Sequence, residues 1–298
     1  MRVFVTGATG FVGTAVVGEL IDVGHQVLGL TRSQASAVQL KSAGALAIEG
    51  SLEDPESLRR GAMAADAVIH TGFNHDFTRF ADNCDLDRRA IETLGEALAG
   101  SSRPLIVTSG LAGLTMGRTT LETDLAPAPS AAYPRQSEAA AMALAARGVQ
   151  AMVVRLPPSV HGEGDHGFVP MLIQMARNKG VSAYVGDGNN LWPATHRADA
   201  AVVYRQLLER GEAGHAYHAV AEEGLAFRDI AECIGQGLGL PVRSIPTSEA
   251  DGHFGWFAGF AQLNAPTSSR QTREVLGWEP RLPGLMADLL ASPSYFQG

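Results

Sequence analysis

The sequence predicts an α/β protein with a doubly wound parallel sheet and a smaller C-terminal α/β lobe. Short apolar runs of strand length alternate with segments of helical periodicity through the first half of the chain. These runs are almost continuously apolar, as expected of strands covered by helices on both faces. At the N-terminus, a β-branched run leads into the glycine segment 7–13 and then into an apolar, helix-periodic stretch, which predicts a strand, a tight turn and a helix.

The expected strands follow one another in the order of a repeated strand and helix unit. Segments 80–99 and 137–147 have helical spacing and separate the later apolar runs. Parallel strands joined in this way need right-handed crossovers, so the runs should form one open sheet. The expected strands are residues 2–6, 26–31, 45–49, 67–71, 104–109 and 150–156.

The pattern changes after about residue 158, where a loop rich in glycine and histidine begins. We therefore expect a first domain over residues 1–158 and mainly a second lobe over residues 159–298. The last residues, 292–298, are expected to form a loose tail. The elements expected in the second lobe are a helix near 170–177, a glycine turn at 186–188, and helices over 227–238 and 272–276.

The composition is that of an ordinary soluble globular protein, with 45% hydrophobic and 18% charged residues among 298. Acidic residues outnumber basic ones by 31 to 23, and the net charge of −8 argues against nucleic acid or an anionic membrane as a partner. Cys84 and Cys233 lie far apart and suggest neither a disulfide framework nor a metal pair. With no run of about 18 apolar residues and no signal peptide, a cytoplasmic location is expected.

The glycines of segment 7–13 have the spacing of a pyrophosphate cradle. Gly7 permits a tight turn, Gly10 lets the backbone approach a phosphate, and Gly13 lets the helix pack closely on the strand. The anion would lie on the free N–H groups at the start of the helix. The intervening residues expected to contact the same dinucleotide are Thr9, Phe11 and Val12.

Four ordered motifs resemble the extended short-chain dehydrogenase/reductase family. They are TGATGFVG at 6–13, GSLED at 50–54, RLPPSVHG at 155–162, and SR at 269–270 with LGWEP at 276–280. The family includes sugar-nucleotide epimerases, dehydratases and carbonyl reductases built on a Rossmann-type domain. The resemblance implies that a segment of about 194–212, which contains HRADAA, returns to the first domain, and that helices 80–99 and 137–147 form a homodimer.

The resemblance also implies which residues line the cofactor. Ser51 and Leu52 are expected to flank the adenine. Thr71, Gly72 and Phe73 are expected to line the path to the nicotinamide ribose. The other residues that the family pattern places against the cofactor are Thr108, Leu156, Pro158, Ser159 and Val160.

The end of the second strand bears on which nicotinamide cofactor is bound. A protein that selects the unphosphorylated dinucleotide usually has Asp or Glu there, whereas this chain has Thr31, Arg32 and Ser33. Arg32 can pair bidentately with a 2′-phosphate and stack on the adenine, and Ser33 can donate one more hydrogen bond. The sequence therefore favours NADP(H) over NAD(H). The alternative is that Arg32 is a solvated surface charge and the site accepts either form.

The family's chemistry uses a serine after the fifth strand, a tyrosine further on, and a lysine one helical turn beyond the tyrosine. Ser109 and Tyr133 match the first two as catalytic residues, but the lysine position holds Ser137, whose neutral hydroxyl cannot lower the pKa of a phenol. Pro134 is best placed as a first helical residue, which would put Tyr133 at a helix cap. Arg135 restores a cation, but residues two apart on a helix do not share a face.

Other side chains offer a substitute proton donor or a substrate contact. His75 follows the fourth strand at the carboxyl edge, where ligands collect in open α/β sheets, and imidazole suits acid–base work near neutrality. The alternative is a solvated loop histidine. His161 stands where the family has tyrosine and is expected in the substrate pocket. We predict no metal site, because segment 161–166 matches no zinc spacing.

An aromatic cluster in the second lobe bears on the substrate. It consists of Phe254, Trp256, Phe257 and Phe260. Most such clusters are core, but if Trp256 faces the substrate, an apolar compound is favoured over a sugar nucleotide. The diphosphate of a sugar nucleotide needs basic residues, which this lobe carries sparsely.

The sequence thus predicts an enzyme, an NADP(H)-dependent oxidoreductase that transfers hydride between nicotinamide and a carbonyl or alcohol of a small, fairly apolar molecule. Two alternatives stay open. One is a sugar-nucleotide epimerase or dehydratase with tightly retained cofactor. The other is a non-catalytic NADP(H)-sensing binding protein, which the serine at position 137 suggests.

Overall fold

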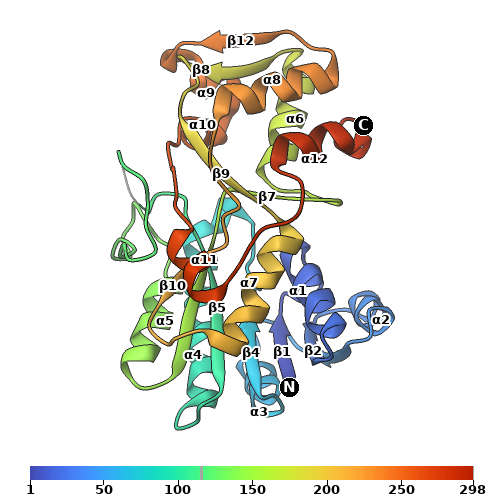
Figure 1. Cartoon of the computed structure of the whole chain (residues 1–298), viewed down its shortest axis with the longest axis vertical. Coiled ribbons are helices and arrows are strands. Elements are labelled where there is room, and N and C mark those ends of the chain that lie inside the picture. The colour runs from blue at the N-terminus through green and yellow to red at the C-terminus, as the bar shows by residue number, and fades with distance from the viewer. Residues whose placement is uncertain (115–116, 298) are drawn as a thin grey trace.

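A computed structural model describes residues 1–114 and 117–297, with a seven-stranded parallel sheet in the larger domain (Figure 1). The strand order is β10-β6-β5-β4-β1-β2-β3, so the winding reverses between β1 and β4, as in a doubly wound fold. This is the predicted sheet, with β10 as a seventh strand that the sequence analysis did not anticipate. The strands are β1 (Arg2–Thr6), β2 (Gln26–Thr31), β3 (Leu46–Glu49), β4 (Ala67–His70), β5 (Pro104–Gly110), β6 (Gln150–Leu156) and β10 (Ala216–His218).

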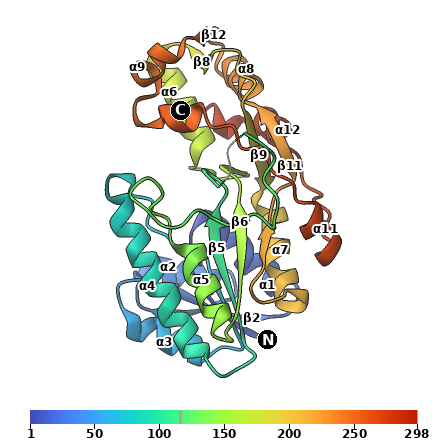
Figure 2. The same cartoon turned by 90° about the vertical axis from the view of Figure 1, so that its left-hand side faces the viewer.

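Helices cover both faces of this sheet (Figure 2). Val3 and Val5 of β1 face one layer of helices and Phe4 faces the other, because successive side chains of a strand point to opposite faces. The first layer contains α1 (Phe11–Asp22), α2 (Gln34–Ser42) and α7 (Arg197–Arg210). The second contains α3 (Pro55–Met63), α4 (Phe80–Leu98) and α5 (Ser137–Ala146).

The smaller lobe packs around its own aromatic core, which contains Trp192, Phe227, Phe254 and Phe257. The two strands β8 (Ser182–Val185) and β12 (Val242–Ile245) pair in parallel within it. A three-stranded sheet, β11-β9-β7, lies between this lobe and the larger domain (Figure 1). The other elements are β7 (Ser159–His161), β9 (Leu191–His196), β11 (Glu222–Ala226), α6 (Phe168–Lys179), α8 (Phe227–Leu238), α9 (Ala250–Phe254), α10 (Ala258–Ala261), α12 (Leu285–Ala291), and the short 3-10 helices η1 (Phe77–Arg79), η2 (Thr247–Glu249), η3 (Gly255–Phe257) and η4 (Pro293–Tyr295).

Two expectations about the second half of the chain are wrong. The helix expected within 272–276, α11 (Arg270–Leu276), packs on α7 and β10 of the larger domain, and Leu276 and Trp278 join the core beside β1. The C-terminal segment is not a loose tail, because Tyr295 is buried and its hydroxyl donates to the Gly162 carbonyl oxygen at 3.1 Å. Gly298 lies outside the described residues.

The parallel arrangement brings the carboxyl ends of β1, β2, β4 and β5 to one edge of the sheet.

Cys84 and Cys233 are buried free thiols. Among the described residues, no helix combines the length and the apolar character needed to cross a membrane.

Candidate functional site

The turn between β1 and α1 is shaped by close backbone contacts. Gly7 has φ +65°, and a Cβ there would lie 2.7 Å from the Gly72 Cα. A Cβ on Gly13 would lie 2.0 Å from the Gly7 carbonyl oxygen, and one on Gly10 would lie 3.2 Å from the same atom. Side chains are therefore excluded at Gly7 and Gly13, and the three predicted glycines form one compact turn.

The start of α1 offers unpaired donors to an anion. The helix begins at Phe11, its N-cap Gly10 makes no side-chain hydrogen bond, and its first turn has no acidic residue. The N–H groups of a first turn have no acceptor within the helix, and the peptide dipoles there favour negative charge. With Thr9 and Val12 half-buried beside it, the turn fits the pyrophosphate of a dinucleotide.

An arginine that sequence analysis missed lies over this turn. The guanidinium carbon of Arg197 is 4.9 Å from the ring centroid of Phe11, and the His166 ring meets the same phenyl ring edge-on at 5.6 Å. Within the described chain this guanidinium has no carboxylate partner. Arg197 is the first residue of α7, so the returning helix supplies a positive charge close to the cradle.

Arg32 and Ser33 lie at the end of β2 as predicted, but only the first is free. Arg32 is exposed and forms no ion pair with the described residues. The Ser33 hydroxyl caps α2, accepting from the Ser36 N–H at 3.2 Å and donating to the Ser36 hydroxyl at 3.1 Å. A hydrogen bond from Ser33 to a 2′-phosphate would compete with this cap, so Arg32 is the stronger candidate.

The residues predicted near adenine and ribose meet beside the glycine turn. The Thr71 hydroxyl donates to the Thr6 carbonyl oxygen at 2.8 Å, and the Gly72 N–H donates to the Thr6 hydroxyl at 3.2 Å. Leu52 Cδ2 lies 3.3 Å from the Cβ position of Gly72. The half-buried Ser51 precedes Leu52, so this part of the predicted cofactor site is assembled in one place.

The cofactor residues predicted at the end of β6 and just after it are buried or half-buried. Ser159 is buried, and its hydroxyl has no partner among the described residues. Leu156 packs against the core beside β1, and its carbonyl oxygen accepts from the Leu111 N–H at 3.0 Å. Pro158 and Val160 are half-buried.

At the carboxyl end of β5, one buried hydroxyl is left without a partner. Ser109 is 2% exposed, and its Oγ has no hydrogen-bond partner in the described part of the chain. The neighbouring Thr108 hydroxyl, by contrast, donates to the His70 carbonyl oxygen and accepts from the Tyr204 hydroxyl, both at 2.8 Å. An unsatisfied buried hydroxyl costs about 1–3 kcal/mol. Ser109 therefore fits a residue that holds an oxygen of a ligand.

The segment before α5 departs from the expected helical geometry. The helix begins at Ser137, and Tyr133 instead closes a turn with Ser130. The Ser130 N–H donates to the Tyr133 carbonyl oxygen at 2.9 Å, and the Tyr133 N–H donates to the Ser130 carbonyl oxygen at 3.1 Å. Pro134 is therefore not the first helical residue, and the expectation of Tyr133 at the helix cap is wrong. Burial raises the pKa of Tyr133, and the charge of Arg135 partly opposes this. The phenol keeps its proton at neutral pH.

The same departure brings Arg135 to the sheet edge. Its guanidinium carbon lies 4.7 Å from the ring centroid of Phe73 and 5.6 Å from that of Phe80. Its Nε is 4.0 Å from the Cβ position of Gly110, the residue after Ser109. The expectation that Arg135 sits on a separate helix face is wrong, because residues 130–136 are not helical.

Ser137, at the family's lysine position, is an internal link. It is 1% exposed and donates to Asp87 Oδ2 at 2.5 Å, while Asp87 Oδ1 accepts from His70 Nε2 at 2.9 Å. His70 Nδ1 in turn forms a hydrogen bond with the Thr6 hydroxyl at 2.7 Å. With the Gly72 N–H donating to Thr6, a buried chain joins α5 and α4 to the loop after β4.

His75 lies among the aromatic rings after β4. Its ring is 5.2 Å from that of Phe73 and 6.3 Å from that of Phe77. Desolvation by these neighbours lowers the pKa of His75, and the charge of Arg135 lowers it further. His75 lies at the sheet edge as predicted, and it is exposed there.

The aromatic cluster of the smaller lobe divides into a buried and an exposed part. Phe254 and Phe257 belong to the lobe core, whereas Trp256 is 56% exposed. Trp256 stacks on Phe77, with ring centroids 5.2 Å apart and 26° between the planes. The predicted substrate residue Trp256 thus meets the loop that carries His75.

His161 lies where β7 packs against α12. It is fully buried, its Nδ1 donates to Asp288 Oδ2 at 2.8 Å, and its ring meets that of His196 edge-on at 5.4 Å. The pair ties β7 to α12, but His161 Nε2 is buried with no hydrogen-bond partner among the described residues, and the place of the ring in the substrate pocket stays a prediction. No group of three His, Cys, Asp or Glu side chains in the described ranges is arranged to hold a metal ion.

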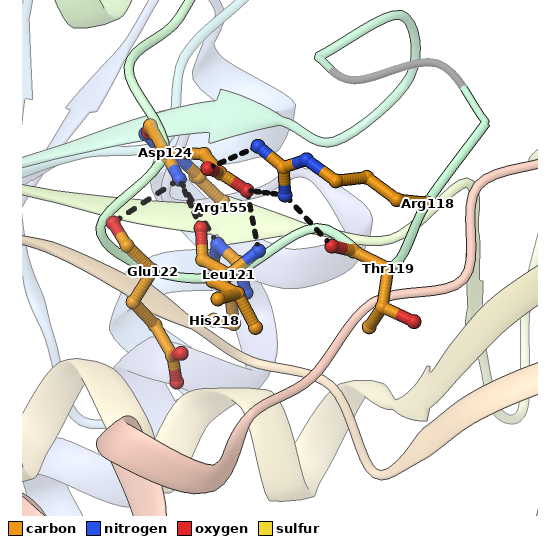
Figure 3. A network of polar contacts seen from close by, with 7 residues as sticks. All are labelled: Arg118, Thr119, Leu121, Glu122, Asp124, Arg155 and His218. Carbon is orange, nitrogen blue, oxygen red and sulfur yellow. Dashed lines mark hydrogen bonds and ion pairs between the residues drawn. The ribbon is translucent and has the colours of Figure 1, made fainter.

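The loop between β5 and α5 is anchored by a buried network around Arg155 (Figure 3). Arg155 pairs with Glu138 and donates to the Asp124 carbonyl oxygen, both at 2.5 Å. The Asp124 carboxylate pairs with Arg118 at 2.6 Å, which lowers the pKa of Asp124 to about 2. His218 Nε2 accepts from Arg155 at 3.1 Å, and burial lowers the pKa of His218 to about 4. The network positions the segment that leads into α5.

The chain matches known proteins over nearly its whole length. The model of the NAD dependent epimerase/dehydratase family matches residues 3–220. An uncharacterized protein of Schizosaccharomyces pombe is 49% identical over 297 residues, which are 99% of this chain and 100% of that protein. A 4-hydroxy-2-methyl-3-oxo-4-farnesyl-3,4-dihydroquinoline-1-oxide ketoreductase of Stigmatella aurantiaca is 29% identical over 89% of this chain and 84% of its own length. A 2-alkyl-3-oxoalkanoate reductase of Stenotrophomonas maltophilia is 29% identical over 81% and 77%.

Solved structures share the architecture. A dTDP-glucose 4,6-dehydratase from Streptomyces venezuelae, solved with NAD bound, has a TM-score of 0.79 and 20% sequence identity, covering 99% of this chain and 97% of that one. At this identity the likeness shows the fold alone. It confirms the predicted Rossmann-type sheet.

Proposed function

The chain belongs to the NAD dependent epimerase/dehydratase family, and we propose that it is an NADP(H)-dependent reductase that converts a carbonyl of a small, fairly apolar molecule to an alcohol. The observation that carries this proposal is the buried hydroxyl of Ser109, which has no partner among the described residues and lies at the same sheet edge as the glycine turn. Two relatives are named as a ketoreductase and an oxoalkanoate reductase, which supports the reaction class.

The residues at the sheet edge fit a nicotinamide dinucleotide. The glycine turn and the first turn of α1 would hold the pyrophosphate beneath Arg197, and Leu52 would lie against the adenine. Arg32 would pair with a 2′-phosphate, and no carboxylate stands at the end of β2 to repel it. When bound, the reduced cofactor supplies the hydride that a carbonyl carbon accepts.

Two side chains would act on the substrate oxygen. Ser109 would donate a hydrogen bond to it, and Tyr133 would pass it a proton as the alcohol forms. Because burial raises the pKa of Tyr133, its phenol keeps a proton that it would deliver to the substrate oxygen. His75 is the weaker candidate, since its lowered pKa leaves the imidazole unprotonated at pH 7.

The surroundings favour an apolar or aromatic substrate. Phe73, Phe77 and the exposed Trp256 form a continuous set of rings between the loop after β4 and the smaller lobe. Such rings bind apolar groups through large contact areas and edge-to-face packing.

A single-turnover assay tests the proposal. NADPH-loaded protein is mixed with a panel of aldehydes and ketones, and loss of the reduced nicotinamide absorbance is followed. Tyr133→Phe should slow the reaction by about 10²–10⁴-fold, whereas Tyr184→Phe on β8 of the smaller lobe should not change it. Full activity of Tyr133→Phe would show that the phenol has only a structural role. His75→Gln would then be tested in the same assay. If the protein binds NADPH but no compound of the panel causes its oxidation, the protein is a cofactor sensor instead.

A further inference from the structure

We propose that Arg135 binds an anionic group of the substrate, so that the preferred substrates are carbonyl compounds that carry a carboxylate on or near the carbonyl carbon. The inference rests on the proposed reductase function and adds the substrate class. Three observations carry it: the guanidinium has no hydrogen-bond or carboxylate partner among the described residues, aromatic rings hold it in place, and it lies at the end of β5, close to Gly110, which directly follows Ser109.

The Arg135 side chain has donors that the fold does not use. It is half-buried, and within residues 1–114 and 117–297 it has neither a hydrogen-bond acceptor nor a carboxylate partner. Acidic residues outnumber basic ones by 31 to 23 in this chain, so carboxylates that could pair with an arginine are abundant. Arg155, for comparison, is held by Glu138 and by backbone carbonyl oxygens. A half-buried guanidinium with free donors can bind an anionic group through charge-assisted hydrogen bonds.

Aromatic rings hold the guanidinium without satisfying it. Phe73 and Phe80 lie 4.7 and 5.6 Å from its central carbon, and cation–π contacts of this kind fix position but accept no strong N–H hydrogen bond. The planar fork of N–H groups remains available. A carboxylate matches that fork bidentately, which a point charge such as lysine cannot do.

The position of Arg135 separates it from the expected phosphates of the cofactor. The pyrophosphate cradle follows β1 and Arg32 follows β2, whereas Arg135 lies over the ends of β4 and β5. In the sheet order β5-β4-β1-β2, this is the side away from the adenosine. Arg135 Nε lies 4.0 Å from the Cβ position of Gly110, and Ser109 directly precedes Gly110. A substrate that places an oxygen on Ser109 and an anion on Arg135 would therefore span the carboxyl end of β5.

A matched pair of substrates tests the inference. Phenylglyoxylate and its methyl ester share the ketone and the aromatic ring but differ in the negative charge. With NADPH, Arg135→Gln should lower kcat/KM for the acid by about tenfold or more, and it should change the value for the ester less than threefold. Arg135→Lys should recover part of the loss. Arg147→Gln, an exposed arginine at the end of α5, controls for the change in net charge and should leave both values as they are.

Other outcomes would overturn the inference. Equal losses for acid and ester would mean that Arg135 acts on the reaction itself, and an equal loss of NADPH affinity would make it a cofactor ligand. If the wild type reduces neither compound, calorimetric titration of NADP⁺-loaded protein with mandelate and methyl mandelate still tests whether Arg135 binds an anion. A preference for mandelate that Arg135→Gln abolishes supports the anion site while the reductase proposal fails. No preference in the wild type rejects the anion site as well.

Discussion

The substitution Gly13→Ala, which adds a single methyl group, should abolish tight cofactor binding without unfolding the protein. Its Cβ would lie 2.0 Å from the Gly7 carbonyl oxygen, whereas real Cβ contacts essentially never fall under 3.0 Å, so β1 and α1 must separate by about 1 Å. A shift of this size moves the N–H groups of the first turn out of the range of about 2.7–3.2 Å for hydrogen bonds. Loss of one bond to a charged group costs about 1.5–3 kcal/mol, which corresponds to a Kd for NADPH roughly 10- to 150-fold weaker.

The same helix supplies the control. Nothing lies within 4 Å of the position where a Cβ on Gly18 would stand. Gly18→Ala should bind NADPH like the wild type and gain up to about 1 kcal/mol of stability, because alanine is the better helix former. Calorimetric titration gives the Kd values, and thermal unfolding followed by circular dichroism shows that both variants are folded. A folded Gly13→Ala variant with the Kd of Gly18→Ala would refute the assignment of the glycine turn as the pyrophosphate site.

The remaining predictions concern two arginines at the sheet edge and the buried histidine of the Arg155 network. Arg32→Ser should weaken NADPH binding about tenfold or more and leave NADH binding unchanged, and equal losses in paired titrations would exclude a contact with the 2′-phosphate. Arg197→Met should weaken both cofactors by a similar factor, roughly tenfold, whereas unchanged affinities would limit Arg197 to packing on Phe11. His218 has a folded pKa of about 4 against 6.5 unfolded, so the native state binds fewer protons between these values, and its contribution to the free energy of unfolding falls by up to about 3 kcal/mol as pH drops through that window. Asp165 opposes this trend, because burial raises its pKa to about 6. Urea unfolding at a series of pH values should therefore show a shallower acid loss for His218→Gln than for the wild type, and parallel profiles would contradict the role of His218.

Local sequence patterns predicted the sheet because each pattern involves adjacent residues. The expected strands 2–6 and 150–156 match β1 and β6 residue for residue, and the run 67–71 exceeds β4 by one residue. Glycine spacing predicted the turn before α1 for the same reason, since Gly13 lies only six positions after Gly7. The helical preference of Pro134 was misleading, because the backbone pairing between Ser130 and Tyr133 satisfies this segment in a turn.

The candidate site was less predictable, because its decisive contacts join distant parts of the chain. Arg135 meets Phe73 across 62 positions, and Arg197 meets Phe11 across 186. The contact of His161 with Asp288, 127 positions later, likewise leaves no local sign in the sequence. A weak signal for Arg197 did exist in the motif HRADAA, where an arginine begins a helix that returns to the first domain.

The distribution of unpaired charge argues that the sheet edge is a binding surface for anions. Arg32, Arg135 and Arg197 follow or border different strands, yet none has a carboxylate partner among the residues that the structure describes. Arg135 and Arg197 are half-buried and could each gain a charge partner from a ligand. An anionic dinucleotide and an anionic substrate would supply those partners, so binding should stabilise the fold by an amount that depends on ionic strength. At a hundredfold excess over Kd, the expected gain is about 2.7 kcal/mol for each ligand.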